Sequence, residues 1–305
     1  MISHVQITYI LALWKQKHFQ KAADTCYVTQ PTLSMQIKKA EEVLGQPIFD
    51  RSFNPIKLTV FGKKTLPYLQ EIQSQYEALD RFIQSMDGNW KEEVRIGIIP
   101  TIALYLVPEF YLKWQEKLKD IQLEIKELKT VDILKALEER SIDVGILAGP
   151  VNEEGLDQHI LFHEEIKLFT KDTDRKEITI NELHSMQPWL LAKGNCLRTQ
   201  MVNFCSIHQE DKKEWRYAGG NLDLLIKMVE QQGGYTLIPE FHQLPKQLKK
   251  HVKEIEGHRP YRQVIALFKK NTSKKEAIKT IAREIQRSKS GTFSQRDVGE
   301  LLPWD

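Results

Sequence analysis

The chain has 305 residues, of which 41% are hydrophobic and 28% charged, and its formal net charge is +3. This composition is typical of a soluble globular protein of two or three domains, and it excludes a disordered chain or one with a membrane span, which needs about 18 consecutive apolar residues. Three cysteines, an odd number in so long a chain, argue against a secreted disulfide framework, so we expect a cytoplasmic location.

Residues 4–58 predict short helices separated by brief turns. In the segment 18–45, HFQKAADTCYVTQPTLSMQIKKAEEVLG, apolar and small side chains recur every three or four residues in two runs. The second run has Thr29 as its expected cap, Pro31 in its first turn and Gly45 at its end. Two helices joined by so short a turn make a helix-turn-helix.

The outer face of the second helix is polar, and residues 15–64 contain nine cations but only four anions. Such side chains hydrogen-bond base edges and phosphates, so we predict double-stranded DNA as a partner. The predicted DNA-contacting residues are Gln30, Pro31, Thr32, Ser34, Gln36 and Lys38, with Arg51 and Lys57 on a hairpin wing over residues 47–62. The alternative is a polar face that contacts only solvent.

One long helix is predicted from Thr59 to Asp87. Its apolar residues repeat at alternating spacings of three and four, which is the pattern of a coiled-coil seam. They are Leu69, Ile72, Tyr76, Leu79, Ile83 and Met86. We interpret the helix as a dimerisation arm; packing of this seam on the C-terminal part of the same chain is the alternative.

Beyond residue 92 the chain alternates between strands and helices. Strands are predicted at 94–100, 121–128 and 142–149, with helices at 101–118 and 130–140 between them. This order implies a parallel sheet with helices on its faces. Segment 161–170 is expected to cross into a second lobe, where strands at 188–193 and 235–239 and helices at 196–205 and 221–232 continue the alternation. Segments 261–270 and 274–287 are expected to return to the first lobe.

Segment 18–45 closely resembles the helix-turn-helix of LysR-type transcriptional regulators, and the order of domains is similar to that family over about 290 residues. Within the family, GIIPTIALYLVP, GNCLRTQMVNFC and RQVIALF resemble the peroxide-sensing, OxyR-type branch. The resemblance implies a transcriptional activator that is a homodimer through the linker helix and a homotetramer. It implies no enzymatic activity, no cofactor, no metal and no membrane association.

The expected fold class is α+β and multidomain: an N-terminal winged helix-turn-helix, a long linker helix, and a C-terminal two-lobed α/β regulatory domain of the periplasmic-binding-protein type. The expected boundaries are 1–58 for the DNA-binding domain, 59–90 for the linker helix and 91–290 for the regulatory domain. Lobe I would span about 91–163 and 267–290, and lobe II about 164–266. Residues 291–305 form a tail without an assignment.

The resemblance also implies site residues. Cys196 matches the thiol that reacts with hydrogen peroxide, and Cys205 matches the thiol that resolves it as a disulfide. Thr101, Thr130 and Arg262 match residues that line the peroxide pocket, and Asn195 and Arg198 in the cysteine loop are also predicted to line it. Asn195 stands where the branch commonly has His, and Thr199 replaces an Asp. Asn cannot carry a proton as His can.

Cys196 has features of a reactive thiol even without the resemblance. It starts a predicted helix, where backbone N–H groups favour a thiolate, and Lys193 and Arg198 are cations nearby in the sequence. We therefore expect a lowered pKa for this thiol, and Gly194 would allow a small molecule to approach the backbone. Peroxide would then oxidise the thiolate to a sulfenic acid.

A helix from 196 to 205 would hold the two cysteines apart by roughly 13 Å along its axis and on opposite faces. Because a disulfide needs Cα atoms within about 7 Å, bridging would require the helix to unwind. Three alternatives stay open. Both thiols can be ordinary buried side chains, the ligand can be a small organic effector held between the lobes, or the protein can be a thiol peroxidase that carries a DNA-binding module.

Overall fold

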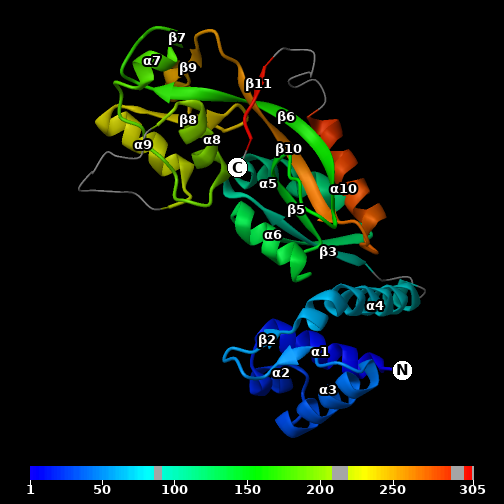
Figure 1. Ribbon diagram of the computed structural model, residues 1–305. Coiled ribbons are helices and arrows are strands. Elements are labelled where there is room, and N and C mark those ends of the chain that lie inside the picture. The colour runs from blue at the N-terminus through cyan, green and yellow to red at the C-terminus, as the bar shows by residue number, and fades with distance from the viewer. Residues whose placement is uncertain (86–90, 208–218, 290–298, 304–305) are drawn as a thin grey trace. The chain divides into compact units, whose positions relative to one another are not determined.

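The computed structural model describes residues 1–85, 91–207, 219–289 and 299–303 (Figure 1). The chain divides into two compact units, residues 1–90 and residues 91–305. Within the described ranges no helix combines the length and the apolar character that crossing a bilayer requires.

The first unit is a winged helix-turn-helix, as the sequence predicts. Its elements are α1 (His4–Gln16), α2 (Phe19–Thr25), α3 (Gln30–Leu44), β1 (Phe49–Asp50) and β2 (Lys57–Leu58). The Thr29 hydroxyl accepts the N–H of Thr32 at the start of α3, and Gly45 ends the helix with a φ of 79°. The antiparallel pair β1–β2 is the predicted wing.

A buried carboxylate fixes the wing to α3. Glu41 is 9% exposed, and its Oε1 accepts the backbone N–H groups of Ile48 at 2.8 Å and Phe49 at 3.1 Å. Its Oε2 accepts from Arg51 at 3.0 Å. Glu41 thus satisfies two backbone donors at the start of the wing, a role that its position in the sequence does not indicate.

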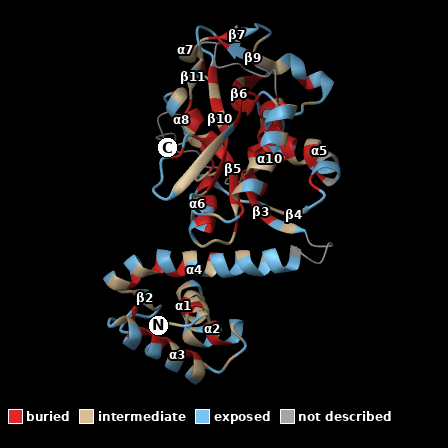
Figure 2. Cartoon of the chain, turned by 90° about the vertical axis from the view of Figure 1, so that its right-hand side faces the viewer, coloured by how far each residue is buried: buried red, intermediate tan, exposed pale blue. Residues whose placement is uncertain are grey.

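The predicted long helix is α4 (Val60–Ser85), and most of its surface is exposed (Figure 2). Leu69 is buried in the core of the first unit, so it does not belong to an exposed seam. Ile72, Tyr76, Leu79 and Ile83 are 41–55% exposed. Met86 lies outside the described residues. A face of four large apolar side chains is therefore open along α4.

The second unit is built on a mixed sheet. Strands β4 (Ile121–Glu127), β3 (Glu92–Ile98) and β5 (Val144–Gly149) are parallel neighbours, which confirms the predicted parallel sheet here. The connecting helices are α5 (Pro100–Lys117) and α6 (Thr130–Glu138). Next to β5 lies β10 (Pro260–Lys269), which is antiparallel to both β5 and β6 (Leu156–Thr170).

Strand β6 contributes side chains to two hydrophobic cores, and β10 pairs with it along much of its length (Figure 1). The first core lies around β3, β5, α5 and α10 (Lys275–Ser288), and it includes residues 264–268 of β10. The second core is formed by the far end of β6 together with α7 (Ile180–Leu183), α8 (Cys196–Phe204), α9 (Leu222–Gln232), β8 (Tyr235–Pro239) and β9 (Val252–Ile255).

The prediction of a strand at 188–193 is wrong. Only Pro188 forms an isolated bridge, to Tyr235, and the rest of the apolar run is a loop that packs in the second core. The short elements β7 (Glu177–Ile178), the 3-10 helix η1 (Lys246–His251) and β11 (Glu300–Leu301) were not predicted, because segments this short show no periodicity. Strand β11 is part of the segment left unassigned.

Replacing Glu41 by Gln tests the attachment of the wing. The amide oxygen is a weaker acceptor and its partner Arg51 loses a counter-charge, so the local free energy of opening should fall by about 1–3 kcal/mol. Hydrogen exchange of peptides covering residues 47–58 should become roughly five- to 150-fold faster. The exposed neighbour Glu42, replaced by Gln, is the control and should leave exchange unchanged; equal exchange in both variants would contradict this role.

Candidate functional site

Helix α8 begins at Cys196 and its last residue precedes Cys205, so the predicted cysteine helix is confirmed. Cys196 packs in the first hydrophobic core and Cys205 in the second, and both thiols are free and buried. Nine residues of helix separate their Cα atoms by roughly 13 Å and by about half a turn. The helix thus anchors one sulfur in each core.

A buried charge network lies beside Cys196. Arg262 on β10 donates from Nε to Glu164 Oε1 at 2.7 Å and from Nη1 to the Thr101 hydroxyl at 3.1 Å. Tyr105 donates its hydroxyl to the same Glu164 oxygen at 2.8 Å. Arg262 and Glu164 are both fully buried. The structure therefore places the predicted pocket residues Thr101 and Arg262 together, and it adds Glu164 and Tyr105.

The prediction of a lowered pKa for Cys196 is wrong. Burial raises the pKa of this thiol and outweighs the opposing effects of the Arg262 charge, the Thr130 hydroxyl and the N–H of Leu197. The cation that acts on the sulfur is Arg262, 66 residues away in the sequence. Because Arg262 is itself paired with Glu164, its charge only partly offsets the cost of burying a thiolate.

The polar environment next to Cys196 is incompletely satisfied. Thr130 begins α6 and its hydroxyl adjoins the thiol, yet Oγ1 has no well-aligned hydrogen-bond partner. The second oxygen of Glu164, Oε2, is also buried and has no hydrogen-bond partner among the residues that the structure describes. Unpaired buried polar atoms are costly, so a small hydrogen-bonding molecule would be stabilised at this position.

Cys205 lies in a different environment. Burial raises its pKa to about 12, although a hydrogen bond with Tyr235 acts in the opposite direction. Its carbonyl lies 3.2 Å from the ring Nε2 of His184. With so high a pKa, Cys205 is a thiol at neutral pH and a poor nucleophile while α8 is folded.

The loop before α8 is held by its own side chains. Asn195 donates from Nδ2 to the Ala192 carbonyl at 2.8 Å, and Arg198 donates to the Leu191 carbonyl at 2.8 Å. Gly194 has a φ of 88°, which lies in the left-handed region, so the backbone conformation favours glycine at this position. The contacts of Asn195 and Arg198 hold this loop, whereas Thr130 and Arg262 lie near the thiol and Thr101 contacts Arg262.

The C-terminal strand contacts the middle of α8. Gln200 is 1% exposed and donates from Nε2 to the carbonyl of Leu302 at 2.9 Å. Leu302 is buried in the second core, and β11 pairs in parallel with β10 at Pro260 and Tyr261. The segment that the sequence left unassigned therefore packs against the helix between the two cysteines.

The predicted DNA-contacting residues all lie in the first unit, but they differ in exposure and in the contacts that hold their side chains. Gln36 accepts a hydrogen bond from Gln6 on α1 at 3.2 Å, so it also links two helices. Arg51 is bound to Glu41 as described, and Lys57 lies 4.2 Å above the ring of Phe53. Pro31 and Lys38 are exposed, whereas Gln30, Thr32 and Ser34 are half-buried.

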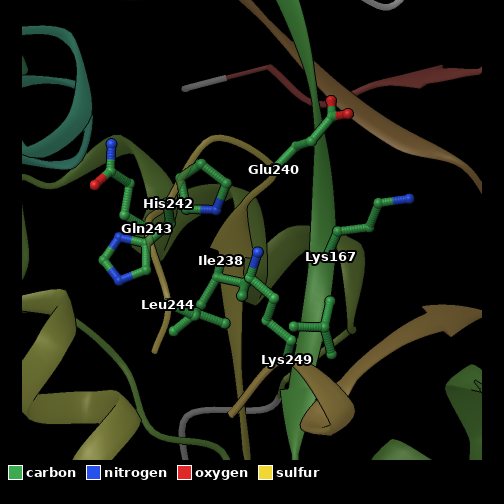
Figure 3. A pocket seen from close by; sticks show the side chains of 9 residues that line it. Lys167, Ile238, Glu240, His242, Gln243, Leu244 and Lys249 are labelled. Carbon is green, nitrogen blue, oxygen red and sulfur yellow. The ribbon is translucent and has the colours of Figure 1, made fainter. Parts of the chain in front are cut away.

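A separate cavity of about 570 Å³ opens in the second lobe (Figure 3). It lies between β6, the end of β8 and η1, and none of the predicted site residues lines it. Its polar lining includes Lys167, Glu240, His242 and Lys249. Lys167 pairs with Glu254 at 2.9 Å, so part of the charge in this cavity is already neutralised.

The buried ion pair near Cys196 makes a testable contribution to stability. Replacing Arg262 by Met leaves Glu164 buried without its cation and should cost about 3–5 kcal/mol of unfolding free energy. Adding Glu164→Gln should recover part of this loss, because the amide needs no counter-charge and still accepts from Tyr105. Denaturant unfolding followed by tryptophan fluorescence measures both variants. Unchanged stability of the single variant would contradict this assignment.

Comparison with known proteins agrees with this architecture. Residues 4–63 match the model "Bacterial regulatory helix-turn-helix protein, lysR family", and residues 87–289 match "LysR substrate binding domain". The chain is 28% identical over 258 residues to the "Hydrogen peroxide-inducible genes activator" of Haemophilus influenzae, covering 83% of this chain and 85% of that protein. It is 29% identical over 274 residues to the "HTH-type transcriptional regulator EstR" of Acinetobacter baylyi, covering 88% and 90%.

Among solved structures, the chain is similar to a full-length OxyR variant from Pseudomonas aeruginosa, with a TM-score of 0.73 and 25% identity over 94% of this chain and 95% of that one. The two family models together span both units, and OxyR proteins stand among the relatives in sequence and in structure. The chain therefore belongs to the LysR family of transcriptional regulators and resembles its OxyR-type members.

Proposed function

We propose that this LysR-family regulator responds to hydrogen peroxide through a reversible disulfide between Cys196 and Cys205. The observation that carries the proposal is the position of α8, which holds one buried thiol in each of two cores. A bridge between these thiols cannot form while the helix is intact. A chemical event at Cys196 is thereby coupled to a change of structure.

The chemistry needs only peroxide as oxidant. The Cys196 sulfur attacks one peroxide oxygen, the O–O bond breaks, and the products are a sulfenic acid and water. The Cys205 sulfur then attacks the sulfenic sulfur, a second water leaves, and the S–S bond forms. Arg262 is placed to stabilise the thiolate and the departing hydroxide, and the Thr130 hydroxyl can hydrogen-bond the peroxide.

Unwinding of α8 would disturb both cores and the C-terminal strand. Leu197 and Met201 are 2% exposed in the second core, and Gln200 holds Leu302. These contacts cannot all persist when residues 196–205 leave the helical conformation. The oxidised protein would then present a different surface around α8 and β11 than the reduced protein does.

The other half of the proposal concerns DNA. The open apolar face of α4 is suited to a second copy of the chain, which would pair two helix-turn-helix units on DNA. A changed surface in the regulatory domains would alter how dimers pair into tetramers, and thus the spacing of the DNA-binding units. The relatives named for peroxide-inducible genes support activation of transcription as the outcome.

A small organic effector is the second candidate ligand. The 570 Å³ cavity of the second lobe is large enough for one, and its lining combines Ile238 and Leu244 with the amide of Gln243 and two lysines. Effector binding there would leave both cysteines reduced. A regulator of this type would keep its response when Cys196 is replaced by Ser.

Peroxide treatment should join Cys196 and Cys205. Wild-type protein should lose 2 Da per chain and yield a cross-linked peptide, while Cys205→Ser should gain one oxygen at Cys196. Hydrogen exchange across residues 196–205 should rise strongly in the oxidised wild type, because the backbone hydrogen bonds of α8 are lost.

Cys196→Ser is the control for this experiment, and its exchange should not respond to peroxide. Two results would contradict the proposal: no bridge after peroxide treatment, or a bridge with exchange across α8 unchanged. A DNA-protection assay with the same proteins should show a peroxide-dependent footprint in wild type only.

The apolar face of α4 should be required for dimerisation. Leu79→Lys places a charge on that face and should raise the dimer dissociation constant by tenfold or more, since about 1.4 kcal/mol corresponds to a factor of ten. Gln84→Lys adds the same charge about 140° around α4 from Leu79, at an exposed position outside the apolar face, and should have little effect. Sedimentation equilibrium compares the two variants, and equal dissociation constants would exclude this face as the interface.

A further inference from the structure

The recognition helix α3 carries an exposed apolar side chain among its polar ones. Met35 is 49% exposed. It is two residues from both Leu33 and Ile37, which are fully buried, and two residues correspond to about 200° of helical rotation. Met35 therefore projects from the side of α3 opposite the core of the first unit.

The neighbours of Met35 define the surface it belongs to. Pro31 is exposed one turn before it, and Lys38 and Lys39 are exposed one turn after it. Tyr27, in the turn before α3, is 95% exposed. Three exposed residues with apolar surface, Tyr27, Pro31 and Met35, thus recur at intervals of four and are followed by two cations that can contact phosphates.

The first half of a recognition helix is the part that meets base edges in the major groove. Hydrogen-bonding side chains read the donors and acceptors there, but the methyl group of thymine is read only by apolar contact. Gln36, the adjacent polar candidate, is held by Gln6 at 3.2 Å. Met35 is unbranched and polarizable, and it can adapt its conformation to a methyl group.

We infer that Met35 contacts a thymine methyl group in the major groove and so contributes to the sequence preference of this protein. The inference rests on DNA binding by α3, which is part of the proposed function. Burying one methyl group contributes about 0.8 kcal/mol, which corresponds to about a fourfold change in affinity for each half-site. A symmetric duplex with two half-sites would show the product of the two effects.

The test removes the methyl group from the DNA. Duplexes are selected from a random library with the full-length wild-type protein, and each thymine of the selected duplex is replaced in turn by uracil, which pairs identically but lacks the methyl. One thymine per half-site should show about a fourfold loss of affinity. Met35→Ala removes the contact in both half-sites, so it should bind the thymine duplex about sixteenfold more weakly, and it should no longer distinguish uracil at that position.

Val43→Ala is the matched control, because Val43 is an exposed apolar residue on the second half of the same helix. It should retain the uracil effect. The inference is overturned if wild type tolerates uracil at every position, or if Met35→Ala keeps the full uracil penalty. Failure to enrich any duplex would contradict DNA binding itself, and with it the proposed function.

Discussion

The fixed separation of two thiols by one short helix is the constraint on which the regulatory half of this protein depends. Helix α8 places Cys196 in the core around β3, β5 and β10, and Cys205 in the core around β6, β8 and α9. Neither sulfur can move toward the other without removing a side chain from a packed interior, where cavities are costly. Under the proposed function, formation of the disulfide would therefore require this segment to change its fold.

The same burial sets the chemistry of the resting state. Both thiols have raised pKa values because both are buried. At Cys196 the charge of Arg262 opposes the effect of burial, and at Cys205 burial raises the pKa to about 12. A thiol that stays protonated reacts slowly with most electrophiles. The Arg262 guanidinium, held by Glu164 and Thr101, supplies a localised positive charge where peroxide oxygen would depart. We expect this arrangement to favour peroxide over bulkier oxidants, because the site is enclosed.

The sequence predicts those helices and strands whose side chains repeat at the spacing of a helix or a strand. Helices α3, α4 and α8, the wing, and the β3–β4–β5 sheet follow from spacing and from cap residues such as Thr29 and Gly45. The apolar run at 188–193 predicts a strand, but its backbone pairs with Tyr235 only around Pro188 and with Gly219 at Ala192, so no continuous ladder forms. A run of apolar residues alone does not distinguish a strand from a buried loop.

The candidate site was predicted in part. The resemblance predicted Thr101, Thr130, Cys196 and Arg262. The structure places Arg262 and Thr130 near Cys196 and Thr101 against Arg262, whereas Glu164 and Tyr105 were not predicted. The charge of Glu164 could have indicated its role, because a charged residue in a strand that is buried on both faces needs a buried partner. The predicted lowering of the Cys196 pKa is wrong because burial raises the pKa more than nearby charge lowers it. Nearness in sequence, as for Lys193, does not show which cation acts on the sulfur.

The most direct measurement is the rate of disulfide closure at saturating peroxide in two variants of Asn203, an exposed residue near the end of α8. Glycine and alanine differ in helix propensity by about 1 kcal/mol, so if α8 must unwind before the sulfurs meet, Asn203→Gly should close up to about fivefold faster than Asn203→Ala. Equal closure rates in the two variants would contradict the coupling between helix and disulfide.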